Sequence, residues 1–220
     1  DLDLLRATIG VDRLNLAGIS YGTRVAQQYA ARYPEHTRTV TLDSIAPNTL
    51  VLGQEHALNL DAAIKQQFAR CVADTACKRN IGDPAALLAK VRTALQAGGL
   101  AAVRYRDPTN GEWREEIPTF GHLGSLLRFY AYRPESASML PLILHDAADG
   151  RYETLLSQSR ALSGDIGDSI ALGMHLSVSC TEDPEIKPRP EDEKTILGNS
   201  IAEFIQTQCA TWPKGKRDPN

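Results

Sequence analysis

A serine stands between two glycines in the segment Gly18-Ile19-Ser20-Tyr21-Gly22. A serine hydroxyl is a poor nucleophile, and it becomes reactive where a histidine can take its proton. A sharp turn from a strand into a helix holds such a serine in a strained conformation above the sheet. Glycines are needed at 18 and 22 because side chains there would collide with the neighbouring strand and helix. We therefore expect Ser20 to be a nucleophile, with the backbone N–H of Tyr21 as one donor to an oxyanion.

The surrounding residues predict the elements that would form this turn. Residues 14–17 are apolar enough for a short buried strand, and residues 23–32 carry small and apolar side chains at helical spacing. A second strand is expected over 39–42, and a first helix ends at Gly10. Because two strands joined through a helix form a right-handed parallel crossover, residues 1–49 predict an α/β core segment.

From about residue 50 the pattern becomes mostly helical. Helices are expected over 57–73, 84–95, 121–131, 137–148 and 151–162. An Asn-Gly pair predicts the tip of a hairpin between 101–106 and 113–117. We interpret 50–169 as a helical cap inserted into an α/β core. Residues 170–220 would then return towards that core, with a last helix over 194–207.

Composition excludes several classes of partner. Apolar residues make up 42% of the 220 residues and charged residues 23%, with a net charge of −3. These values are ordinary for a globular protein and predict neither nucleic acid nor a membrane surface as a partner. The basic run 214–217 is expected to be a solvated tail, and the opening residue Asp1 indicates a processed or excised piece.

The four cysteines are Cys71, Cys77, Cys180 and Cys209. An even number permits two disulfides in three pairings, and four buried free thiols are the alternative. The spacing of Cys71 and Cys77 does not match the close pairs of zinc sites. It suits a short disulfide that closes the turn after a helix. Two bridges would indicate an oxidising compartment, either periplasmic or secreted.

A family resemblance rests on three stretches of sequence around the serine. The run 15–24, the pair Tyr33-Pro34 and the segment 42–47 resemble α/β-hydrolases of the tripeptidyl aminopeptidase and proline iminopeptidase group. The Cys71/Cys77 pair and the segment Cys180-Thr181-Glu182-Asp183 are similar to that group too. The resemblance covers nearly the whole chain and is looser in the cap.

The resemblance implies a serine exopeptidase that needs no cofactor and no metal. Members of the group are secreted, periplasmic or cytoplasmic, and the four cysteines favour an exported one. The enzyme would release proline or short peptides from substrates with a free N-terminus, through an acyl-enzyme on Ser20. Such an enzyme needs a carboxylate to bind the substrate's ammonium, and Glu182 with Asp183 matches that role. The alternative interpretation is a solvated acidic turn before Pro184.

The group's pattern is incomplete in this chain. Its histidine-glycine loop would precede Asp1, and its triad aspartate and histidine would follow the last helix. We therefore expect this portion to be inactive alone, with the rest of its parent chain as a partner. Within the chain, His175 is the best substitute for the base and Asp43 for the triad acid, while His36 is expected on the surface. An esterase or lipase-like hydrolase and a non-catalytic cap or binding fragment are the other two interpretations.

Overall fold

The computed structural model describes residues 1–183 and 186–217, with side chains at every described position except 164–169. Pro184, which follows the acidic pair, therefore lies outside the described residues, as do positions 218–220 of the return segment.

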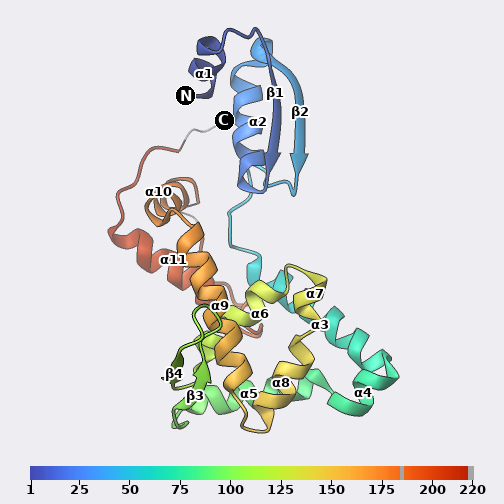
Figure 1. Ribbon diagram of the computed structural model, residues 1–220. Helices are drawn as coiled ribbons and strands as arrows, with labels where there is room; N and C mark the ends of the chain where they lie inside the picture. Colours follow the sequence, from blue (N-terminus) through green and yellow to red (C-terminus); the bar gives the residue numbers. More distant parts are fainter. Residues whose placement is uncertain (184–185, 218–220) are drawn as a thin grey trace.

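The first part of the chain forms a small α/β unit (Figure 1). Its elements are α1 (Leu2–Thr8), β1 (Leu14–Ile19), α2 (Tyr21–Arg32), a 3₁₀ turn (Pro34–His36) and β2 (Thr37–Asp43). The strands pair in parallel, with Ile19 opposite Asp43, which confirms the predicted crossover. α2 ends at Arg32, because Pro34 disfavours a helical conformation at the residue before it, Tyr33. The carboxyl ends of both strands and the amino end of α2 therefore meet beside Ser20.

A helical block follows, and it has its own hydrophobic core. Its helices are α3 (His56–Ala73), α4 (Thr75–Ile81), α5 (Pro84–Ala97), α6 (Phe120–Tyr130), α7 (Pro134–Ala137), α8 (Leu140–Ala148) and α9 (Glu153–Ser169). Fully buried leucines line the centre: Leu123, Leu126, Leu127, Leu140 and Leu155. The predicted hairpin is confirmed as the antiparallel pair of β3 (Val103–Arg106) and β4 (Trp113–Glu116).

Several helix boundaries differ from the predictions, and α9 continues to Ser169 instead of ending at 162. The single helix expected over 137–148 is two helices, and Pro141 lies in the first turn of α8, where the missing N–H of proline costs no hydrogen bond. The last helix begins at Ser200 rather than at 194. The hydroxyl of Thr195 accepts a hydrogen bond from the Gly198 N–H at 3.0 Å, and Gly198 has a φ of 57°. These local bonds hold a turn where a helix was expected.

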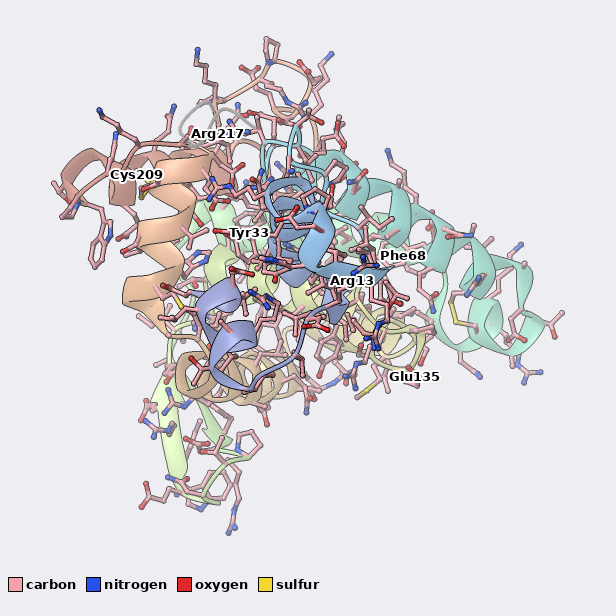
Figure 2. All side chains as sticks on the ribbon, turned by 90° about the horizontal axis from the view of Figure 1, so that it is seen from above. Arg13, Tyr33, Phe68, Glu135, Cys209 and Arg217 are labelled. Carbon is pink, nitrogen blue, oxygen red and sulfur yellow. A yellow bond between two sulfur atoms is a disulfide. The ribbon has the colours of Figure 1, made fainter. Side chains whose placement is uncertain are left out.

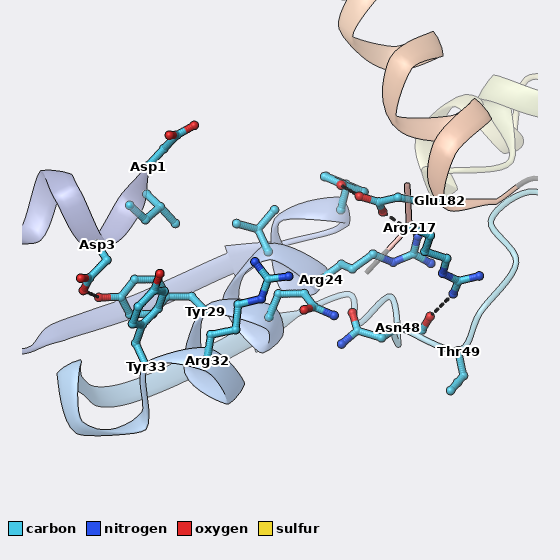
Figure 3. A pocket seen from close by; sticks show the side chains of 14 residues that line it. Asp1, Asp3, Arg24, Tyr29, Arg32, Tyr33, Asn48, Thr49, Glu182 and Arg217 are labelled. Carbon is cyan, nitrogen blue, oxygen red and sulfur yellow. Dashed lines mark hydrogen bonds and ion pairs between the residues drawn. The ribbon is translucent and has the colours of Figure 1, made fainter. Parts of the chain in front are cut away.

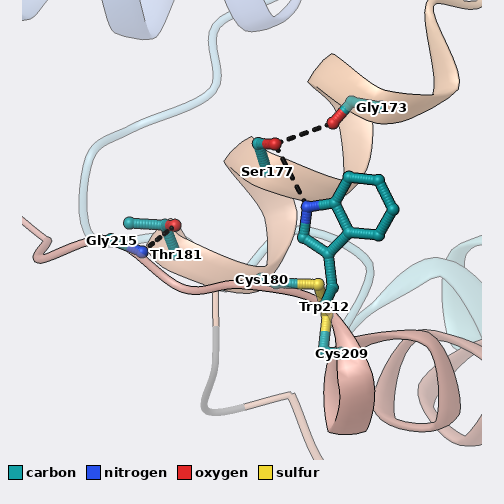
Figure 4. Close-up of a disulfide and its surroundings, with 7 residues drawn as sticks. All are labelled: Gly173, Ser177, Cys180, Thr181, Cys209, Trp212 and Gly215. Atoms are coloured by element: carbon teal, nitrogen blue, oxygen red, sulfur yellow. Dashed lines mark hydrogen bonds between the residues drawn. A yellow bond between two sulfur atoms is a disulfide. The ribbon is translucent and has the colours of Figure 1, made fainter.

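The return segment contains α10 (Leu172–Glu182) and α11 (Ser200–Thr211), which the Cys180–Cys209 disulfide joins (Figure 4). Near this bridge the indole N–H of Trp212 donates to the Ser177 hydroxyl at 3.1 Å. The N–H of Gly215 donates to the Thr181 hydroxyl at 2.9 Å. The chain beyond α11 is thereby tied to the carboxyl half of α10.

The second disulfide joins Cys71 at the end of α3 to Cys77 in α4, with the two Cα atoms 5.2 Å apart. All four cysteines are therefore oxidised, and the alternative of four free thiols is wrong. The short bridge follows a helix, as its spacing predicted, and Asp74 caps the next helix by accepting the N–H of Cys77 at 2.7 Å.

The return segment contacts both other parts of the chain. The N–H of Ile196 donates to Asp61 of α3 at 2.8 Å, and Leu197 belongs to the core of the helical block. Glu182 and Asp183 instead bind α2. Seen from above, Cys209 of α11 lies at the left of the molecule and Phe68 of α3 well to the right of it (Figure 2). Among the residues that the structure describes, none of the helices is both long and apolar enough to cross a membrane.

Candidate active site

Ser20 has a strained backbone at the junction of β1 and α2. Its φ of 52° and ψ of −123° lie in a region that residues other than glycine rarely adopt. Three hydrogen bonds hold this conformation. The Ser20 N–H donates to the carbonyl of Asp43 at 3.0 Å, and the Ser20 carbonyl accepts from the Thr23 N–H at 3.0 Å and from its hydroxyl at 2.6 Å. The geometry is the predicted strand–turn–helix with serine at its apex.

The two glycines of this turn differ in their surroundings. A Cβ atom added at Gly18 would lie 2.7 Å from the carbonyl carbon of Gly22 and 2.8 Å from the Cα of Thr23, so the turn excludes any side chain at 18. A Cβ atom added at Gly22 meets no described atom within 4 Å. The prediction that a side chain at 22 would collide with a neighbouring strand or helix is therefore wrong for the described residues.

Tyr21 is the first residue of α2 and extends its side chain towards the return segment. The first N–H groups of a helix have no acceptor within the helix, and the helix dipole is positive there, so the Tyr21 N–H suits a developing oxyanion. The Tyr21 hydroxyl donates to Glu182 Oε1 at 2.8 Å. Burial raises the pKa of this hydroxyl above its ordinary value, and the bond to Glu182 raises it further. Tyr21 therefore stays protonated as a donor to Glu182.

Arg24 forms the centre of a charged cluster one turn further along α2. Only 4% of the residue is exposed. Its Nη1 donates to Glu182 Oε2 at 3.1 Å and to the two Asp183 oxygens at 3.3 and 3.2 Å. Its Nη2 donates to the carbonyls of Pro47 at 3.3 Å and Leu50 at 2.7 Å. One side chain thus ties α2 to the loop after β2 and to the end of α10.

Glu182 and Asp183 differ in exposure although they are adjacent. The Glu182 side chain is 31% exposed, whereas that of Asp183 is 2% exposed and also accepts the N–H of Leu52 at 3.0 Å. Neither is a fully solvated acid. Glu182 is half-buried beside the amino end of α2, and its role in binding substrate stays a prediction.

A cavity of about 700 Å³ runs along α2 (Figure 3). Tyr21, Arg24 and Glu182 line one end, and Asp3, Tyr29 and Tyr33 line the other. Arg217 of the tail also lines it and donates to the Asn48 carbonyl at 2.8 Å. Glu182, which the sequence predicts to bind substrate, therefore lines an open cavity.

The histidines have their contacts away from Ser20. Each of four lies beside another group: His36 beside Asp3, His56 beside Arg128, His122 beside Thr119 and His145 beside Asp146. His175 is exposed on α10. Asp43 places its carbonyl beside Ser20, while its carboxylate accepts the Ser44 hydroxyl at 3.2 Å. The described residues therefore bring no histidine into hydrogen bond with Ser20.

Metal ligands do not gather in the described part of the chain, where no group of three or more histidine, cysteine or acidic side chains could hold an ion. The residue that sequence reasoning missed is Arg24. A signal existed, because Tyr21 and Arg24 are three positions apart on one helix and so share a face. Their partners, however, lie 161 and 158 residues away in the chain.

Comparison with known proteins agrees with this geometry. Residues 1–139 match the family described as alpha/beta hydrolase fold. Over 97% of its length the chain is 24% identical to the serine protease Hip1 of Mycobacterium tuberculosis, of which the match covers 44%. A shorter stretch of 69 residues is 33% identical to the tripeptidyl aminopeptidase of Streptomyces lividans, covering 31% of this chain and 13% of that protein. The chain spans less than half the length of these curated relatives. By its matched residues and its fold, the chain belongs to the α/β-hydrolase family.

Proposed function

We propose that the protein is a serine hydrolase that acts as an exopeptidase, with Ser20 as the nucleophile. Ser20 would attack the scissile carbonyl and form an acyl-enzyme, which water then hydrolyses. The observation that carries this proposal is the strained backbone of Ser20 at the amino end of α2, with φ at 52°. Gly18 is closed to side chains by the same turn.

The oxyanion would bind at the Tyr21 N–H. One such donor contributes about 3–4 kcal/mol to the transition state in enzymes of this kind. The general base and the second oxyanion donor would come from parts of the protein outside these 220 residues, and this portion alone would be inactive. Asp43 and His175 are kept as weaker internal substitutes for the acid and base.

Substrates would be peptides with a free N-terminus, from which proline or a short peptide is released. Glu182 supports this choice because it presents a half-exposed carboxylate to the cavity beside α2. A charge-assisted hydrogen bond to an ammonium contributes about 1.5–3 kcal/mol, enough to select free over blocked N-termini. The names of two relatives, a serine protease and a tripeptidyl aminopeptidase, support a peptide substrate. The two disulfides favour a periplasmic or secreted protein.

Substrate preference tests this proposal in the full-length protein. Tripeptide and proline arylamides would be compared with the same compounds acetylated at the N-terminus, and with p-nitrophenyl esters. We expect the free peptides to be hydrolysed and the acetylated ones to lose at least tenfold in kcat/KM. Glu182→Gln should remove this difference. Turnover of esters alone, with no effect of Glu182→Gln, would favour an esterase or lipase-like enzyme, and no turnover at all would favour a binding fragment.

A further inference from the structure

Four side chains meet where α2, the loop after β2 and the end of α10 come together. They are Tyr21, Arg24, Glu182 and Asp183. The guanidinium of Arg24 lies 6.0 Å from the centre of the Tyr21 ring, so the two side chains of α2 reach the acidic pair side by side. The cluster holds one positive charge and two negative charges.

The two carboxylates have different partners. Asp183 is buried and receives Arg24 Nη1 together with the Leu52 N–H at 3.0 Å. Glu182 receives the same Nη1 atom on one oxygen and the neutral Tyr21 hydroxyl on the other. The second terminal nitrogen of Arg24 is turned away to backbone carbonyls. Arg24 therefore offers a single nitrogen to both acids.

The charge count decides what Glu182 can bind. A lone Arg24–Glu182 pair would be neutral and would present no net charge to a cation. Because Asp183 pairs with the same guanidinium, the cluster has one negative charge more than positive charges. Glu182 is the more exposed of the two acids. Arg32 and Arg217 also line the cavity, but both are exposed, and Arg217 donates to the Asn48 carbonyl. Water weakens the interactions of these two exposed charges, whereas Arg24 is buried beside both carboxylates.

We propose that Asp183 is a positioning residue that offsets the charge of Arg24, so that Glu182 can bind the ammonium of a peptide N-terminus. This inference rests on the proposed exopeptidase function. Arg24 and the Tyr21 hydroxyl fix the Glu182 carboxylate in place, and Asp183 determines the net charge of the cluster without touching substrate.

The test uses the full-length protein and the ratio of kcat/KM for a free tripeptide arylamide to that for its N-acetylated form. Asp183→Asn keeps the shape and an oxygen acceptor but removes the charge. We expect the ratio to fall about tenfold, through a higher KM for the free peptide, with kcat and the acetylated substrate unchanged. A matched control is Asp192→Asn, because Asp192 is also buried and paired with an arginine, Arg189, at 2.8 Å. That variant should leave the ratio unchanged.

A charge-restoring variant distinguishes the charge from a merely structural role. Arg24→Gln combined with Asp183→Asn removes one charge of each sign, and should recover at least half of the lost ratio on a logarithmic scale. If Asp183→Asn does not fold, the double variant should still prefer the free peptide. A wild-type ratio in Asp183→Asn, or no preference in the double variant, would overturn the inference. Failure of the wild-type protein to prefer free peptides would instead overturn the proposed function.

Discussion

The α/β unit and the helical block bury their apolar side chains to different extents. In the block, Leu123, Leu126 and Leu127 of α6 are all 0% exposed and belong to one core with residues of α8 and α9. In the unit, Leu4 is 73% exposed, and Ile19 at the end of β1 is 69% exposed. The helical block is thus a complete hydrophobic core, whereas the two-stranded unit leaves much of its apolar surface open among the described residues.

This difference shows how the candidate site is held. Strained backbone persists only where its surroundings fix it. Around Ser20 the described contacts are mostly polar, namely the hydrogen bonds to Asp43 and Thr23 and the cluster around Arg24. The chain passes through the helical block, with its buried core, before Glu182 returns to α2. Substitutions in the unit should therefore affect activity first, and those in the block should affect stability first.

The largest effect is expected from Gly18→Ala. Its new methyl group would overlap the backbone of Gly22 and Thr23, so the turn must shift. A displacement of a nucleophile by about 1 Å can cost about a hundredfold in rate, and we expect at least that loss in kcat/KM for a tripeptide arylamide.

Gly22→Ala is the control from the same turn, because its methyl group meets no described atom within 4 Å. We expect it to keep activity within a few-fold of wild type. A loss as large as that of Gly18→Ala would show that atoms outside the described residues crowd position 22, as the sequence interpretation held.

In the helical block, Leu144→Ala should lower the free energy of unfolding by about 3 kcal/mol, since Leu144 is 1% exposed in the core. Leu142→Ala in the same helix should change it by less than about 0.5 kcal/mol, because Leu142 is 55% exposed. Urea denaturation measures both. Similar effects of the two substitutions would contradict a complete core in this block.

Removal of either disulfide should lower the free energy of unfolding, and the two losses should differ by about 1 kcal/mol. The reason is that the unfolded chain gains more entropy when a longer loop is opened. The Cys180–Cys209 bridge spans 29 positions and the Cys71–Cys77 bridge spans 6. Replacing Cys180 and Cys209 by serines should also reduce peptide hydrolysis, since Glu182 follows Cys180 by two residues. Equilibrium unfolding and kcat/KM of the two double variants test this. A larger loss from the short bridge would contradict it.

A further effect, on the pH dependence of stability, concerns His56 at the start of α3. Burial lowers its pKa from 6.5 to about 4, and the charge of Arg128 adds to the shift. Between pH 6.5 and 4 the unfolded chain therefore binds a proton that the folded chain does not, so the free energy of unfolding falls as the pH falls. His56→Gln should flatten this dependence. An identical pH dependence in wild type and His56→Gln would contradict the assignment.

Sequence patterns predicted the parts of the fold that depend on neighbouring residues. The strand–turn–helix at Ser20, the hairpin and the bridge of Cys71 to Cys77 follow from local spacing, and the structure has all three. The start of α11 was missed because the hydrogen bonds of Thr195 compete with helix formation there.

The cluster around Arg24 could be predicted only in part. Glu182 was singled out as an acid, but its contacts come from residues more than 150 positions away in the chain. No local pattern encodes such contacts. The different surroundings of Gly18 and Gly22 could not be predicted either. The sequence motif requires glycine at both positions, while the structure crowds only Gly18 among the described residues.

The central claim is that Ser20 is an activated nucleophile, and covalent labelling tests it most directly. The full-length protein would be treated with a fluorophosphonate probe, and the modified residue identified by mass spectrometry, with Ser20→Ala as the control. We expect labelling at Ser20 in wild type, none in Ser20→Ala, and loss of peptide hydrolysis in step with labelling. Labelling at another serine, or peptide hydrolysis that survives in Ser20→Ala, would contradict the claim.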